Sequence, residues 1–241
     1  MTQVTPPLGE DFAAPLGPRS ADMPTPRVYR LPGVYAPQGD TALLLANLAR
    51  EEFRSGARSL DLCTGTGVVA VASALRGTRA TAVDISRAAV TTARLNALRH
   101  RCRVRLFRGD LDAPVAHERF DLITVNPPYV PCEDPALPAR GRRRAWDAGT
   151  DGRILLDRVC ARVPRLLTAS GTLLVVQSSL SGVTATLDGL HRAGLRARVA
   201  DRRVQPFGPV MASREDWFAA RGLVPPGTRT EDLVVIRASR A

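Results

Sequence analysis

The 241-residue sequence contains no lysine, so arginine alone supplies the basic side chains behind its formal charge of +11. A preference for arginine along the whole chain is typical of a GC-rich genome, which weakens the charge as a sign of nucleic-acid binding. Aromatic residues make up only 5% of the chain and leave few side chains on which bases could stack. The charge therefore fits an acidic protein partner as well as it fits a nucleic acid.

The sequence also gives no support for a membrane protein, a secreted protein or a metal-binding protein. No apolar run approaches the roughly eighteen residues that a membrane span needs, and the N-terminal stretch MTQVTPPLGEDF lacks the layout of a signal peptide. The four cysteines form no CxxC pair, and with only three histidines they indicate neither a zinc site nor a disulfide framework. We therefore predict a cytoplasmic protein with reduced cysteines and no metal site.

The length and the 44% hydrophobic content suit one α/β domain with a single core. Residues 1–26 contain six prolines and no apolar period, so they cannot bury enough surface to offset the entropy lost on ordering. We predict a flexible, proline-rich tail over residues 1–26 and one domain over residues 27–241.

Strand and helix patterns alternate along this domain. Apolar runs predict seven strands, at residues 57–63, 78–84, 103–110, 120–126, 171–178, 195–202 and 232–239. Helices are predicted between them, at residues 41–53, 68–76, 87–100 with Ser86 as its cap, 152–167 and 181–192. The alternation predicts an α/β fold that is Rossmann-like and doubly wound, with a mainly parallel seven-stranded sheet. Residues 204–230 are predicted to be an insertion before the final strand.

The first chemical motif is DLCTGTG at residues 61–67, where the first predicted strand turns into a helix. Gly65 and Gly67 let the backbone approach a ligand closely, and the helix N-terminus offers N–H donors. Dinucleotide enzymes hold pyrophosphate at such a turn, so the glycines alone do not choose the cofactor. Asp61 favours S-adenosylmethionine, because its carboxylate can pair with the ammonium of the methionine moiety. A plain tight turn is the alternative.

Two aspartates end the next two predicted strands. Asp84 follows the glycine turn by about twenty residues, at the position where a carboxylate accepts hydrogen bonds from ribose hydroxyls. Asp110 lies where a side chain can receive the amino group of adenine. A chance acidic residue is the alternative for Asp84, and a turn aspartate is equally plausible for Asp110.

The most informative motif is VNPPYV at residues 125–130, after the fourth predicted strand. Pro127 and Pro128 end the hydrogen-bond ladder and fix the backbone, because proline has no N–H and a locked φ. Open α/β sheets bind their substrates at the carboxyl ends of strands. The motif therefore predicts a rigid substrate site.

The residue types of this motif suit methylation of a planar nitrogen. An amide or aromatic-amine nitrogen is a poor nucleophile because its lone pair is delocalised. It becomes competent when its NH2 donates both hydrogens to fixed acceptors, here the side-chain oxygen of Asn126 and the carbonyl of Pro127. Tyr129 would pack on the planar group. We predict that Asn126, Pro127, Pro128 and Tyr129 form the catalytic motif.

Taken in order, DLCTGTG, Asp84, GDL and NPPY resemble class I S-adenosylmethionine-dependent methyltransferases of the HemK family. These are protein-glutamine N5-methyltransferases that modify the GGQ loop of translation release factors. The stretches VYAPQGDTALLLANL (34–48) and RRRAWDAGTDGRILLDRV (142–159) are similar to two further family segments. Both belong to the short branch of the family, which lacks a separate N-terminal helical domain.

The resemblance implies a role for each matching residue. It implies S-adenosylmethionine as the cofactor. The methionine end of the cofactor is assigned to Thr41, Asp61, Gly65 and Gly67, the ribose to Asp84 and Ile85, and the adenine to Asp110 and Leu111. Asn126 to Tyr129 would grip the substrate glutamine, with Asn126 also beside the cofactor. The implied partners are a protein substrate, in the first place a release factor, and a small zinc-containing activator subunit, which the sequence neither demands nor excludes.

The sequence departs from the family pattern in three places. Ala36 and Gly39 each replace a glutamate at the rim of the site, and the 204–230 insertion is longer than usual. The protein substrate is therefore less firmly implied than the cofactor. The arginine cluster before Trp146 is equally compatible with a contact to an acidic substrate and with a solvated loop; it comprises Arg140, Arg142, Arg143 and Arg144.

Other substrates share the chemistry. The motif NPPY also occurs in enzymes that methylate adenine or cytosine amino groups, which are equally planar. Such enzymes flip the target base and usually carry an added recognition domain, for which this chain has little length left. We expect a protein glutamine, with a small molecule or a nucleic-acid amino group as the alternatives, and a binding protein without turnover as the least supported one.

Overall fold

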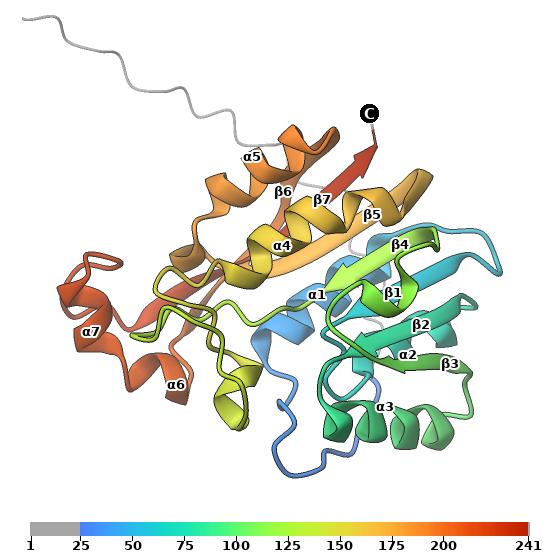
Figure 1. Cartoon of the computed structure of the whole chain (residues 1–241), viewed down its shortest axis with the longest axis horizontal. Coiled ribbons are helices and arrows are strands. Elements are labelled where there is room, and N and C mark those ends of the chain that lie inside the picture. Colours follow the sequence, from blue (N-terminus) through green and yellow to red (C-terminus); the bar gives the residue numbers. More distant parts are fainter. Residues whose placement is uncertain (1–24, 241) are drawn as a thin grey trace, which may run out of the picture.

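The computed structural model describes residues 25–240 (Figure 1). The predicted tail over residues 1–26 lies almost entirely outside them. The helices are α1 (Gly39–Arg50), α2 (Val68–Leu75), α3 (Arg87–Arg99), α4 (Ile154–Arg162), α5 (Val183–Arg192), α6 (Pro209–Ala212) and α7 (Glu215–Ala220). The strands are β1 (Arg58–Leu62), β2 (Arg79–Asp84), β3 (Val104–Arg108), β4 (Phe120–Val125), β5 (Leu167–Ser178), β6 (Leu195–Pro206) and β7 (Thr230–Arg240).

The seven strands form one sheet in the order β3-β2-β1-β4-β5-β7-β6. The five strands from β3 to β5 are parallel, as predicted, and each of β1, β2 and β4 pairs with parallel neighbours. β7 runs antiparallel to both β5 and β6. The prediction of a mainly parallel seven-stranded sheet is confirmed, and β7 is the strand that departs from the parallel direction.

The reversed direction of β7 follows from the connection that precedes it. Pro206 at the end of β6 pairs with Thr230 at the start of β7, and the Phe207 amide donates to the Arg229 carbonyl at 2.8 Å. A chain that re-enters a sheet from the end it has just left must run antiparallel. Because β6 extends to Pro206, the predicted insertion over 204–230 begins with strand residues, and its helical part is α6 and α7.

The helices cover both faces of the sheet. In Figure 1, α4 and α5 lie in front of the sheet and α1 and α2 behind it. Their inner faces enclose a core of aliphatic side chains from β1, β4, β5 and β7. α4 ends at Arg162 instead of the predicted residue 167, because Pro164 has no N–H to continue the α-helical hydrogen bonds; Val163 keeps a helical conformation and the chain continues as a short 3-10 helix over Pro164–Leu166.

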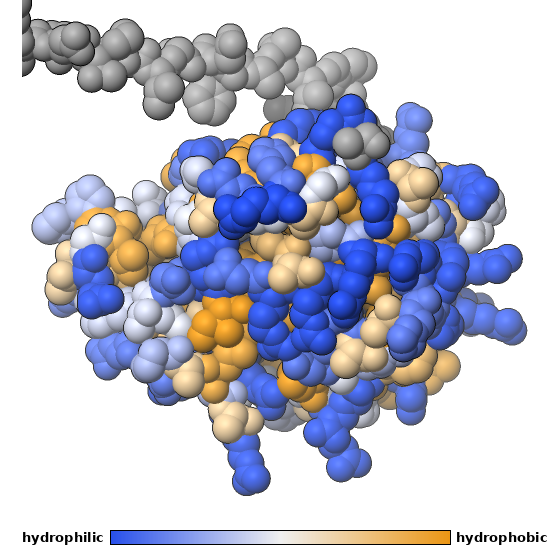
Figure 2. All heavy atoms as spheres, turned by 45° about the horizontal axis from the view of Figure 1, so that its top comes forward, coloured by the Kyte–Doolittle hydropathy of each residue, from blue (hydrophilic) through white to orange (hydrophobic). Residues whose placement is uncertain are grey.

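The surface carries the arginine-rich character of the sequence. Hydrophilic side chains cover most of the face shown in Figure 2, with smaller apolar groups between them. Within residues 25–240, no helix has the length and apolar character that a bilayer span requires.

The two glycines after β1 meet different surroundings. Gly65 and Gly67 have φ values of 54° and 78°, which residues other than glycine rarely adopt. A Cβ at Gly65 would meet nothing within 4 Å, whereas a Cβ at Gly67 would lie 2.7 Å from the Cβ and 2.9 Å from the Cα of Ala93 in α3. Gly67 therefore allows α2 and α3 to pack closely, and Gly65 leaves space open in front of the turn.

Replacing Gly67 by alanine should cost stability through both backbone strain and this clash. We expect Gly67→Ala to lower the free energy of unfolding by about 3 kcal/mol, measured by urea titration. Gly194→Ala is the control, because Gly194 also has a positive φ of 79° but has nothing within 4 Å of an added Cβ. It should cost about 1 kcal/mol. Equal losses for the two variants would contradict the packing role of Gly67.

Candidate active site

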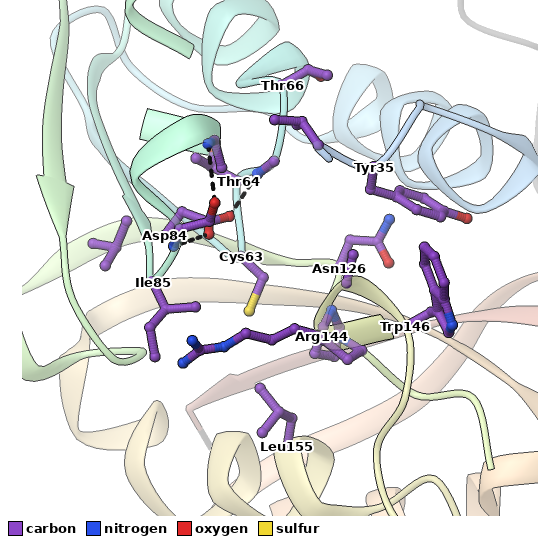
Figure 3. A pocket seen from close by; sticks show the side chains of 18 of the residues that line it. Tyr35, Cys63, Thr64, Thr66, Asp84, Ile85, Asn126, Arg144, Trp146 and Leu155 are labelled. Atoms are coloured by element: carbon purple, nitrogen blue, oxygen red, sulfur yellow. Dashed lines mark hydrogen bonds between the residues drawn. The ribbon is translucent and has the colours of Figure 1, made fainter. Parts of the chain in front are cut away.

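The carboxyl ends of β1, β2, β3 and β4 open into one cavity of about 550 Å³. The site residues predicted from the sequence converge there. Of the twelve predicted positions, eleven line the cavity: Thr41, Asp61, Gly65, Asp84, Ile85, Asp110, Leu111, Asn126, Pro127, Pro128 and Tyr129. Gly67 instead faces Ala93. In Figure 3, Asp84 and Ile85 lie at one end of the cavity, and Asn126, Tyr35 and Trp146 lie towards the other.

Asp84 is fixed by backbone amides. Its Oδ2 accepts from the Gly65 amide at 2.9 Å and its Oδ1 from the Ser86 amide at 2.8 Å (Figure 3). Burial raises the pKa of Asp84, and these amide hydrogen bonds oppose the rise. The predicted partners Gly65 and Asp84 are thus joined directly. The Ser86 side chain also accepts from the Ala89 amide at 3.3 Å, which confirms it as the cap of α3.

Asp61 lies deeper in the same cavity. Its carboxylate accepts hydrogen bonds from the hydroxyls of Thr64 at 2.5 Å and Thr124 at 2.7 Å. Burial nevertheless raises the pKa of Asp61 to about 6, well above the usual range of a carboxyl group. A buried carboxylate of this kind gains from a cationic partner, which would favour its ionised form.

Asp110 and Leu111 follow the end of β3. Asp110 is half exposed and its Oδ2 pairs with Nη2 of Arg158 from α4 at 2.5 Å. Leu111 is buried and has a positive φ of 49°, an uncommon conformation for a leucine. The backbone therefore bends sharply at the place where the sequence predicts an adenine contact.

Asp40, which the sequence analysis did not propose as a site residue, lies beside the NPPY motif at one end of the cavity, which we call the NPPY end. Asp40, in the first turn of α1, is only 3% exposed and accepts hydrogen bonds from five groups. Its Oδ1 accepts from the amide and the hydroxyl of Thr41, at 2.5 and 3.1 Å. Its Oδ2 accepts from the Asn126 Nδ2 at 3.1 Å, the Tyr35 hydroxyl at 3.2 Å and the Tyr129 hydroxyl at 3.3 Å.

This contact decides which way the Asn126 amide faces. An ionised carboxylate has acceptors only, so the group that Asn126 turns towards Asp40 must be its NH2. Nδ2 also lies 3.4 Å from Oγ1 of Thr41. With the NH2 held on that side, the Oδ1 of Asn126 is left as an acceptor for another ligand.

Two phenols stand beside this pair. Burial raises the pKa of both Tyr35 and Tyr129, with the negative charge of Asp40 as the next cause, so both remain protonated donors to Asp40. Ser181 Oγ donates to the Tyr129 carbonyl at 2.6 Å and holds the backbone that follows the prolines. The NPPY segment is therefore fixed through side chain and backbone together.

The arginine cluster divides between two roles. Arg140 and Arg144 line the cavity, and Arg144 extends across it towards Ile85 in Figure 3. Arg143 instead pairs through Nε with Oδ2 of Asp147 at 2.6 Å. The sequence left open a contact to an acidic substrate and a solvated loop; Arg140 and Arg144 lie in the cavity wall, and the contact to an acidic substrate stays a prediction.

Comparison with known proteins agrees with this geometry. The sequence matches the methyltransferase small domain family over residues 26–136. It is 34% identical over 181 residues to a protein of Methanocaldococcus jannaschii assigned as a protein N5-glutamine methyltransferase, covering 75% of this chain and 90% of that protein. It is 38% identical over 174 residues to the release factor glutamine methyltransferase of Bordetella pertussis, and 44% identical over 125 residues to the ribosomal protein uL3 glutamine methyltransferase of Bradyrhizobium diazoefficiens.

The fold has solved counterparts as well. The Mtq2–Trm112 complex of E. cuniculi, which methylates the termination factor eRF1, contains a chain that aligns with a TM-score of 0.60 at 22% identity, over 87% of this chain and 99% of that one. The fold and the site thus define a class I methyltransferase. Within that class, this chain belongs to the HemK family of protein glutamine N5-methyltransferases. It spans 64% of the Bordetella relative and 39% of the Bradyrhizobium one.

Asp40 can be tested through the orientation of Asn126. In Asp40→Asn the new amide both donates and accepts, so Asn126 can turn either way. We expect methyl-transfer turnover to fall on the order of 10²-fold while cofactor affinity changes little. Asp201→Asn is the matched control, because Asp201 Oδ2 also accepts from an asparagine Nδ2, that of Asn47 at 3.2 Å, and neither residue lines the cavity. Full turnover in Asp40→Asn would contradict the orienting role.

Proposed function

We propose that this chain transfers a methyl group from S-adenosylmethionine to the N5 amide nitrogen of a protein glutamine. The orientation of Asn126 carries the proposal, because its Oδ1 and the Pro127 carbonyl can each accept one hydrogen of a planar NH2. Held in this way, the nitrogen keeps its lone pair free to face the sulfonium methyl. No general base with a shifted pKa is needed, since the amide proton can leave after methyl transfer.

The cofactor assignment rests on three carboxylates at adjacent strand ends. Asp61 is the penultimate residue of β1, Asp84 is the last residue of β2, and Asp110 comes two residues after β3; these three strands are neighbours in the sheet. In that order they suit the ammonium of the methionine moiety, the ribose hydroxyls and the adenine amino group. Thr41, Gly65, Ile85 and Leu111 complete the proposed set, and S-adenosylmethionine supplies the methyl group as a sulfonium.

The substrate class rests on the relatives. The Bordetella protein is named for release factors and the Bradyrhizobium protein for ribosomal protein uL3, so glutamine is common to both and the protein is not. We propose the GGQ loop of a release factor as the substrate, as the sequence resemblance implies. A target in the translation machinery would agree with the predicted cytoplasmic location. No contact in the site favours a small molecule or a nucleic acid.

The activator subunit belongs to the same proposal. The E. cuniculi relative was solved as a complex with a second chain, Trm112. A small zinc-containing partner of that kind would add to an edge of the sheet. Activity of the chain alone, without a second protein, would show that no activator subunit is required.

A labelling experiment tests the substrate. We expect labelled methyl groups from S-adenosylmethionine to reach a release factor, and the label to disappear when its GGQ glutamine is replaced. Parallel reactions contain uL3, bulk RNA and duplex DNA. Asn126→Ala is the inactive control: it should abolish turnover while calorimetry still detects cofactor binding.

The outcomes of this experiment are distinct. Label on uL3 alone would keep the glutamine chemistry and overturn the release factor as substrate. Label on nucleic acid alone would overturn the protein substrate altogether. Activity only after adding a cell extract depleted of release factors would establish the need for an activator.

Asp61 predicts a pH dependence of cofactor binding. The cofactor ammonium requires the ionised carboxylate, whose pKa in the free protein is about 6. Affinity should therefore be constant between that value and about pH 7, above which the cofactor ammonium begins to lose its proton, and should fall roughly tenfold for each pH unit below it. Calorimetry across this range checks the effect, and Asp61→Asn should bind weakly with a much flatter profile. An unchanged slope in Asp61→Asn would assign the dependence to another group.

A further inference from the structure

The insertion between β6 and β7 packs beside the NPPY end of the cavity. Its helices α6 and α7 bury Met211 and Phe218, and the ring of Phe218 meets that of Phe207 edge to face at a centroid distance of 6.0 Å. In Figure 1 these helices lie next to the loop that follows β4. The insertion is therefore a packed element and not a free appendage.

The loop next to it forms one wall of the cavity. We call residues 131–147 the wall loop, because seven of its residues line the cavity: Leu137, Ala139, Arg140, Gly141, Arg144, Ala145 and Trp146. The middle of the loop is exposed and its two ends are buried. Its position thus depends on how those ends are held.

Backbone hydrogen bonds join the two ends. The Val130 amide donates to the Trp146 carbonyl at 2.8 Å, and the Ala148 amide donates to the Val130 carbonyl at 3.1 Å. Val130 directly follows the NPPY residues. The wall loop therefore starts and ends beside the catalytic motif.

Arg214 from the insertion contacts both ends of the wall loop. Its Nη2 lies 2.6 Å from Oδ1 of Asp147, and its Nη1 donates to the Pro131 carbonyl at 2.9 Å. The Arg214 side chain is 18% exposed and the Asp147 side chain is fully buried. The guanidinium thus donates a hydrogen bond to the Pro131 carbonyl and faces the Asp147 carboxylate as an ion pair, without an aligned hydrogen bond to Oδ1.

Asp147 depends on this contact. Its other cation is Arg143, which lies within the wall loop itself and has a side chain that is 56% exposed. Without Arg214, the buried carboxylate would be held only by a partner that moves with the loop. Leaving a buried charge poorly paired is costly, so the loop end would shift towards solvent.

We propose that Arg214 is a positioning residue that fixes the wall loop, and with it Trp146, against the NPPY motif for binding of the protein substrate. This role rests on the proposed function, because the wall loop faces the substrate end of the cavity. The insertion, which is longer than the family pattern, thereby shapes the substrate site without touching the reacting atoms.

Hydrogen exchange and steady-state kinetics together test this role. In Arg214→Ala, the amides of Val130, Cys132 and Ala148 should exchange faster while those of β1 and β4 are unchanged. The KM for the protein substrate should rise about tenfold or more, with the cofactor Kd within about twofold of the original. Arg214→Lys should restore part of the KM, because it keeps the charge but not the planar guanidinium. Arg229→Ala is the control, since Arg229 pairs with Glu215 inside the insertion and leaves the wall loop untouched.

Several results would overturn the proposal. Unchanged exchange in the wall loop would do so, as would faster exchange throughout the sheet with equal losses of substrate and cofactor affinity, which would show a general structural role. If the unaltered chain methylates no protein, the proposed function fails. The exchange experiment then still decides whether Arg214 holds the wall loop.

Discussion

The active site depends on one buried carboxylate that can only accept hydrogen bonds. Asp40 comes from the helix before the first strand, yet it orients the amide of Asn126 after the fourth strand, at 3.1 Å. The same carboxylate holds the hydroxyls of Tyr35 and Tyr129. In the proposed mechanism, the two prolines fix the backbone and Asp40 fixes the side chain, so the acceptors are in place before a substrate arrives. Such preorganisation is what a weak, delocalised nucleophile needs.

The other end of the cavity, where the cofactor is proposed to bind, is positioned in a different way. There the sheet topology does most of the positioning, because three parallel strands end side by side and each has an aspartate at or near its end. The environments of these aspartates differ: Asp61 is buried among threonine hydroxyls, Asp84 is tied to two backbone amides, and Asp110 is half exposed beside Arg158. These differences suit the proposed binding of the ammonium, the ribose and the adenine of one cofactor along a single row of carboxylates.

The sequence predicts the features that arise from local patterns. Apolar runs locate the parallel strands, the glycine turn and the Ser86 cap locate the starts of two helices, and the strand ends locate the cavity. Contacts between distant segments escape this reasoning. The position of Asp40 beside Asn126 joins residues 86 apart, and the stretch PQGDT carries no local sign of it beyond its place in the family resemblance. The reversal of β7 depends on how the insertion returns, and the role of Gly67 depends on Ala93 in another helix. The contacts of Arg214 with Asp147 and Pro131 are of the same long-range kind.

The central claim is that Asp40 turns the oxygen of Asn126 towards the substrate amide. A crystal structure with S-adenosylhomocysteine and a glutamine-containing peptide tests it most directly. The account predicts that the glutamine nitrogen lies about 3 Å from both Asn126 Oδ1 and the Pro127 carbonyl, with Nδ2 still on Asp40. An Asn126 amide that presents its nitrogen to the glutamine, or a glutamine bound away from the NPPY segment, would contradict it.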